Sequence, residues 1–155
     1  MRIPIPGAML LLALLVSSPL FSAPLHAADS PSPVGTWTTI DDETGQPKSI
    51  IEIREQGGEL TGKVVEVLQS DQGPNPVCRE CKGERHDQPV VGMTILWGLR
   101  KDGDEWSGGQ ILDPHNGKTY KCKMRLVEDG SQLEVRGFIG FSLLGRTQTW
   151  LRRAP

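Results

Sequence analysis

The feature that most constrains the fold of this chain is a series of turn dipeptides between short runs of alternating apolar and polar residues. Gly57-Gly58, Asp102-Gly103, Asn116-Gly117 and Asp129-Gly130 each separate two such runs. These dipeptides favour the positive φ angles of tight hairpin turns, which join antiparallel strands that follow one another in sequence. The pattern therefore predicts an all-β chain built mostly from hairpins.

Eight strands are expected, and no stretch repeats its apolar residues with a helical period. Sequential antiparallel strands lose their exposed edges by closing on themselves, so we expect an eight-stranded antiparallel up-and-down β-barrel rather than a sandwich. The lumen of such a barrel is either filled by side chains or holds one small ligand. The predicted strands are residues 34–40, 49–55, 59–69, 90–99, 105–112, 118–127, 131–139 and 146–152.

The N-terminal segment has the form of a secretory signal peptide. Arg2 precedes a leucine-rich run over residues 8–18, and small residues follow up to Ala27 and Ala28. The apolar run is shorter than the ~20 residues that a membrane-spanning helix needs. We therefore expect residues 1–27 to be the signal peptide and residues 28–155 to form a single domain that is periplasmic or secreted and has no transmembrane span once mature.

The charge balance restricts the kinds of partner. The chain has 17 lysines and arginines against 19 aspartates and glutamates, a formal net charge of -2. Such a balance gives no electrostatic basis for binding nucleic acid or an anionic membrane surface. A small hydrophobic molecule held in a pocket, with an envelope protein as a further partner, fits the sequence better.

The period-two pattern predicts which side chains face the lumen. In residues 90–99 the inner set is Val91, Met93, Ile95, Trp97 and Leu99. An apolar interior of this kind either fills the core completely or leaves room for a small apolar or amphipathic ligand. The predicted ligand-binding residues are Met93, Trp97, Trp106, Tyr120, Met124, Phe138 and Phe141, of which the two phenylalanines are expected near the rim.

Cys78 and Cys81 form a C-x-x-C motif in a connection of about 20 residues, which is long for a compact domain. In an oxidising compartment we expect a local disulfide between them, with Cys122 as a free buried thiol. A bridge from Cys81 to Cys122 is the structural alternative. The motif is not followed by the helix that thiol redox catalysis needs. A zinc site that uses these three cysteines and His86 is a further alternative, but the sequence has no second C-x-x-C pair to support it.

Catalytic motifs are not evident. Ser142 lacks the glycine two residues later that a nucleophile elbow requires, and His115 lies in a "DPHNG" string explained by turn geometry. We therefore expect a protein that is not an enzyme, with no catalytic residue, cofactor or metal.

The first and last predicted strands each contain one residue of an expected structural contact. Trp37 lies in the first strand and Arg152 in the last, and closure makes these strands neighbours. An arginine guanidinium can stack on the indole ring and donate to backbone carbonyls, which would seal that end of the barrel.

These residues also carry a resemblance to known families. The G-x-W start and the arginine of the last strand resemble the lipocalin and calycin signature. The strings "VGTW", "GMTILWGL", "DEWSGGQILDPHNGKTYKC" and "RGFIGFSLLGRTQTW", with the C-x-x-C loop, resemble secreted bacterial proteins grouped as domain-of-unknown-function family twenty-one forty-seven. The resemblance covers essentially the whole mature chain and implies an exported lipocalin-like barrel that binds small hydrophobic molecules.

An apolar cluster suggests an alternative function. Residues 138–144, here called the apolar lip, include Phe138, Ile139, Phe141, Leu143 and Leu144 between glycines. Such a cluster packs over the barrel end, or forms a patch that contacts a protein or a lipid. The alternatives to ligand binding are thus an envelope interaction or stress module that acts through this lip, and a thiol or zinc protein.

Overall fold

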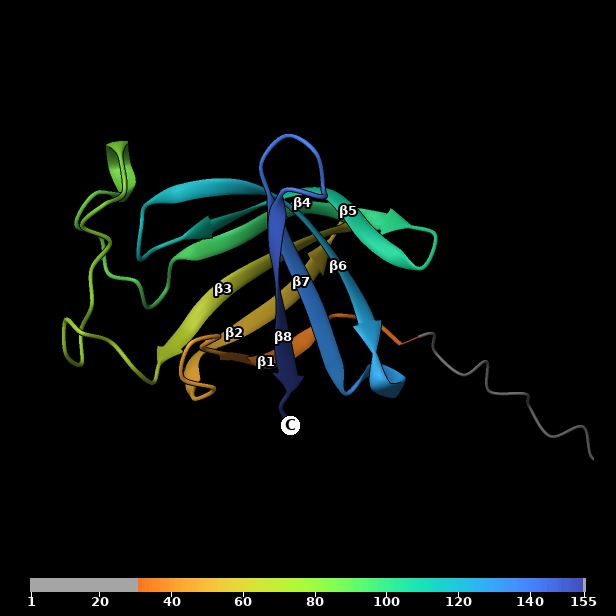
Figure 1. The fold of residues 1–155 in the computed structure, drawn as a ribbon, viewed down its shortest axis with the longest axis horizontal. Helices are drawn as coiled ribbons and strands as arrows, with labels where there is room; N and C mark the ends of the chain where they lie inside the picture. The colour runs from red at the N-terminus through yellow and green to blue at the C-terminus, as the bar shows by residue number, and fades with distance from the viewer. Residues whose placement is uncertain (1–30, 155) are drawn as a thin grey trace, which may run out of the picture.

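Within residues 31–154, the part of the chain that this computed structural model describes, eight antiparallel strands form one closed barrel in sequential order. Figure 1 shows the strands following one another around the barrel. The expected fold class is therefore confirmed, whereas the expected signal peptide lies outside the described residues. The strands are β1 (Gly35–Ile40), β2 (Pro47–Gln56), β3 (Glu59–Val67), β4 (Thr94–Asp102), β5 (Glu105–Asp113), β6 (Lys118–Val127), β7 (Gln132–Phe138) and β8 (Gly145–Arg152).

Closure comes from pairing of the first and last strands. Trp37 of β1 is opposite Arg152 of β8, and Thr39 is opposite Trp150. Every strand also pairs with its neighbours in sequence. Hairpin connections join all consecutive strands except β3 and β4. These two are joined by a long connection, coloured yellow-green to green in Figure 1, which extends to one side of the barrel and contains a short 3₁₀ turn, η1 (Gly83–Arg85).

The segment leading into β4 departs from the prediction. The strand begins at Thr94 rather than at residue 90, and Val91, expected to face inward, is 45% exposed. Leu96 is fully buried while Trp97 is only half-buried, so the expected inner position of Trp97 was wrong. Gly98 has a φ of 77°. An irregularity of this kind breaks the period of two, so the inner set shifts from Trp97 to Leu96.

One end of the barrel is packed solid. Trp37, Ile51, Ile53, Leu99 and Leu133 are fully buried in the core. At this end lie the residues before β1, the hairpin turns β2–β3, β4–β5 and β6–β7, and the end of β8. The lumen is therefore filled here, and its open part lies toward the opposite end.

Arg152 and Trp37 seal the packed end. The guanidinium of Arg152 lies over the indole ring, with Cζ 4.3 Å from the ring centroid. It donates to the backbone carbonyls of Gly130 at 2.6 Å, Ser32 at 2.7 Å and Val34 at 3.1 Å. The residue thus joins the N-terminal segment, the β6–β7 turn and the last strand in one contact.

Among residues 31–154, no helical segment has the length and hydropathy needed to cross a bilayer.

Candidate functional site

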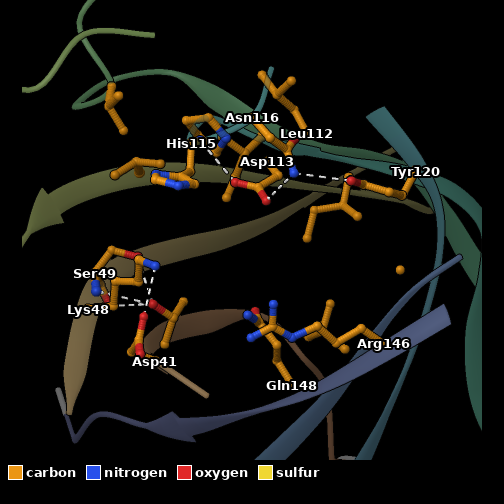
Figure 2. Close-up of a pocket in the computed structure, with 18 of the residues that line it drawn as sticks. Asp41, Lys48, Ser49, Leu112, Asp113, His115, Asn116, Tyr120, Arg146 and Gln148 are labelled. Carbon is orange, nitrogen blue, oxygen red and sulfur yellow. Dashed lines mark hydrogen bonds and ion pairs between the residues drawn. The ribbon is translucent and has the colours of Figure 1, made fainter. Parts of the chain in front are cut away.

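The candidate site is a cavity of about 890 Å³ at the end opposite Arg152. Its walls come from all eight strands, and its rim comes from the connections β1–β2, β3–β4, β5–β6 and β7–β8. A cavity of this size is within the range of small-molecule sites, which is about 300 to 1,000 Å³. Figure 2 shows its polar side chains in separate groups around the opening.

The first polar group lies on the rim at the β1–β2 connection. Asp41 accepts hydrogen bonds from Lys48 Nζ at 2.9 Å and from the backbone N–H groups of Thr44 at 2.9 Å and Glu43 at 3.1 Å. These donors, Lys48 first, hold the pKa of Asp41 far below its usual range. The carboxylate therefore stays ionised and fixes the conformation of this turn.

The second polar group comes from the β5–β6 turn and reaches Tyr120 of β6. Asn116 Nδ2 donates to Asp113 Oδ2 at 2.9 Å and to the Tyr120 hydroxyl oxygen at 3.1 Å (Figure 2). Because the Tyr120 oxygen accepts from Asn116, its own O–H is free to donate to a molecule in the cavity. Asp113 also accepts from the backbone N–H of His115 at 2.9 Å.

A third polar group lies deeper, on β1, β2 and β8. Thr39 Oγ1 and Ser49 Oγ are 2.8 Å apart, and Thr39 Oγ1 also accepts from the Ser49 backbone N–H at 3.1 Å. On β8 the Trp150 indole N–H donates to Gln148 Oε1 at 3.3 Å. An indole nitrogen can only donate, so the oxygen of Gln148 must face Trp150 and its amide N–H groups face elsewhere.

The C-x-x-C connection forms part of the rim. Cys78 and Cys81 are joined in a disulfide, and both are buried. Cys78 Sγ lies 3.2 Å from the carbonyl oxygen of Pro114, in the β5–β6 turn. Gly117 of the same turn has a φ of 66°, and a Cβ on it would lie 1.9 Å from the Glu80 carbonyl oxygen. The connection is therefore packed directly on the β5–β6 turn.

Cys122, the third cysteine, is a free thiol on β6 and is buried. Burial raises the pKa of this thiol to about 12, so at neutral pH it stays protonated and is a poor nucleophile and metal ligand. Among residues 31–154, no three histidine, cysteine or acidic side chains are grouped so that they could hold a metal ion.

The structure separates the seven residues predicted to bind a ligand. Tyr120 and Phe138 line the cavity. Met93, Trp106 and Met124 are buried in the core but do not line the cavity. Trp97 stacks with Arg85, whose Cζ is 4.9 Å from the ring centroid. Phe141 is 80% exposed, at the tip of the β7–β8 connection.

Several lining residues were missed because they are polar. Thr39, Ser49 and Gln148 have the same strand parity as the buried Trp37, Ile51 and Trp150. Continuing the inward set by two residues from each of these apolar anchors would have found them. An expected set restricted to apolar side chains leaves these residues out, although the mouth of a binding barrel also contains polar groups.

Comparisons with known proteins agree with this architecture. The solved structure of protein HP1028 from the human pathogen Helicobacter pylori, which belongs to the lipocalin family, matches with a TM-score of 0.67 and 20% sequence identity. The match covers 78% of this chain and 82% of that chain. No curated protein matches the sequence.

The closed barrel, filled at one end and hollow at the other, is a lipocalin-like fold. The chain belongs to the family described as "Uncharacterized protein conserved in bacteria (DUF2147)", whose model matches residues 35–152.

Proposed function

We propose that this protein is an exported, non-enzymatic barrel that binds one small hydrophobic or amphipathic molecule in its cavity. The observation that carries the proposal is the space of about 890 Å³, bounded by apolar strand residues and by a few convergent polar groups. The lipocalin-like fold supports it as an analogy of architecture.

Trp150 provides a reporter for binding, because it lines the cavity whereas Trp37, Trp97 and Trp106 do not. Titration with a panel of apolar metabolites, including fatty acids, should change the tryptophan fluorescence. The change should be lost in Trp150→Phe and retained in Trp97→Phe, with folding of both variants checked by circular dichroism. If the wild-type signal stays flat across the panel, and native mass spectrometry of protein purified from its own host finds no bound small molecule, the proposal fails.

Export is part of this proposal. The buried disulfide between Cys78 and Cys81 supports an oxidising compartment. N-terminal sequencing of protein from a periplasmic or culture fraction should give a mature chain that begins near Ala28. Full-length protein retained in the cytoplasm would contradict export.

A second candidate function uses the apolar lip at residues 138–144. Ile139, Phe141, Leu143 and Leu144 are 65%, 80%, 88% and 69% exposed. Adjacent exposed apolar side chains favour contact with another protein of the envelope. Phe141→Asp should then abolish capture of that partner while ligand-dependent fluorescence of Trp150 is unchanged. A partner that binds the variant equally well would exclude this role for the lip.

A further inference from the structure

The polar and apolar strand residues of the cavity lie on opposite sides. β8, β1 and β2 are neighbours in the barrel, and their lining residues are polar apart from Gly145 and Trp150. β3, β4 and β5 are also neighbours, and their lining residues are apolar except Asp113, the last residue of β5. The polar side comprises Thr39, Lys48, Ser49, Arg146 and Gln148, and the apolar side comprises Val64, Val67, Ile95, Ile111 and Leu112.

These two sides face each other across the lumen. In a closed barrel of eight sequentially ordered strands, β1 and β5 are diametrically opposed. Figure 2 shows Asp41, Ser49 and Gln148 across the opening from Leu112. The polarity of the strand residues that line the cavity therefore changes across its width, while Asp113, His115 and Asn116 lie beside Leu112 at the β5–β6 connection.

The polar side offers hydrogen-bond donors along its length. The Gln148 amide N–H groups face away from Trp150 because the oxygen accepts from the indole. The hydroxyl oxygens of Thr39 and Ser49 lie 2.8 Å apart, and Thr39 Oγ1 can also donate to the Ser49 carbonyl oxygen at 3.4 Å. When Thr39 donates to Ser49 Oγ instead, the Ser49 O–H is left for another acceptor. A ligand with oxygen acceptors spaced along one edge can satisfy these groups together.

The cationic side chains at the rim add little to the affinity for a ligand with a single anionic head group. Lys48 Nζ lies 2.9 Å from Asp41 Oδ2, and Arg146 is ion-paired with Asp42. Within residues 31–154, the lysine and the arginine that line the cavity therefore already have carboxylate partners. A fatty-acid carboxylate would compete with these carboxylates for each cation.

From these observations we infer that the ligand is a facial amphiphile: a rigid molecule with several hydroxyl or carbonyl oxygens on one face and an apolar opposite face. This inference deepens the proposed function and rests on it. The polar face contacts Thr39, Ser49 and Gln148, and the apolar face contacts Val64, Ile95 and Ile111. A head-to-tail amphiphile leaves part of the polar side without partners, which weakens its binding.

Three probes distinguish a facial amphiphile from a head-to-tail amphiphile. Each has one carboxylate, so differences in their affinities come from the rest of the molecule. Cholate carries its hydroxyls on one face of a rigid ring system, lithocholate has the same rings with fewer hydroxyls, and palmitate is a flexible chain. Isothermal titration calorimetry on the mature protein should give the highest affinity for cholate, by about fivefold or more over lithocholate, which is the effect of one to two hydrogen bonds.

Gln148→Leu removes the amide donors of Gln148 from the polar side, and Gln110→Leu is the matched control because Gln110 is exposed on β5. Gln148→Leu should lower the affinity for cholate by about fivefold to thirtyfold and change that for palmitate by about twofold or less. Gln110→Leu should change neither affinity. Ser49→Ala, a smaller change on the same side, should weaken cholate selectively if Gln148→Leu does not fold.

The outcomes distinguish the inference from the proposed function. The facial-amphiphile inference would be wrong if palmitate binds as tightly as cholate. It would also be wrong if neither Gln148→Leu nor Ser49→Ala reduces the preference for cholate. In both cases the proposed function, ligand binding in the cavity, would remain. If none of the three probes binds and the protein from its own host carries no small molecule, both fail.

Discussion

The guanidinium of Arg152 stacks on the indole of Trp37 and donates to three backbone carbonyls from two other segments of the chain. Burial lowers the pKa of Arg152 from its ordinary value. Hydrogen bonds from a partly desolvated guanidinium contribute more to stability than those from an exposed one. The contact therefore reinforces the pairing of β1 with β8 that closes the barrel.

Replacing Arg152 should destabilise the barrel. Arg152→Ala should lower the free energy of unfolding by about 2 to 4 kcal/mol, because the stacking and the carbonyl hydrogen bonds are lost together. Arg152→Lys should cost about 1 to 2 kcal/mol, since one ammonium cannot reproduce the planar fork. Urea denaturation of the mature protein measures both. Arg54→Ala, which removes an exposed ion pair with Glu52, is the control and should change stability by about 0.5 kcal/mol or less.

The contact between the C-x-x-C connection and the β5–β6 turn can be tested at Gly117. Gly117→Ala should cost about 2 to 4 kcal/mol, because the new Cβ adds a clash with the Glu80 carbonyl to the strain of a positive φ. Gly45→Ala isolates the strain, since Gly45 has a φ of 69° and nothing within 4 Å of a Cβ. It should cost about 1 kcal/mol. Equal costs in thermal or urea unfolding would show that the packing on Glu80 is unimportant.

Thiol counting tests the cysteine arrangement. Protein denatured without reductant should give one reactive thiol, that of Cys122, and reduced protein should give all 3 cysteines. In the native state the pKa of Cys122 is raised to about 12, so its alkylation at pH 8 should be much slower than in the denatured chain. Three thiols in the unreduced protein would contradict the disulfide. Rapid native labelling of Cys122 would contradict its burial.

The Asp41 carboxylate gives a stability contribution that depends on pH. Its pKa is lowered in the folded protein, so the contribution is fully present above the usual pKa of an aspartate and is lost as the pH falls toward the folded-state value. Asp41→Asn should therefore be less stable than wild type at pH 6 to 7, and the difference should shrink in acid. Urea midpoints from pH 7 to pH 2 measure this. A difference independent of pH would mean that the ionised form of Asp41 is not what matters.

The strands were predictable because turn chemistry and alternation agree over most of the chain. The predicted 118–127 strand is identical to β6, and most other boundaries differ by one or two residues. The main failure is the start of β4, where Val90 and Met93 are buried although they precede the strand. Burial there comes from packing of the β3–β4 connection, which a period-two pattern cannot distinguish from a strand.

The site was harder to predict because alternation shows which face a side chain occupies but not its height along the barrel. Tyr120 and Met124 share the inner face of β6, yet only Tyr120 reaches the cavity. The height depends on how far each strand is shifted against its neighbours, and irregularities such as the one at Gly98 change that shift locally.

The position of the Arg152 contact also determines how this molecule can be attached to anything else. Residues 31 and 154 both lie near the packed end of the barrel, while the cavity opens at the opposite end. A tag, a tether or a surface coupled near residue 154 therefore leaves the entrance facing free solution. Immobilised protein should capture its ligand as well as free protein does.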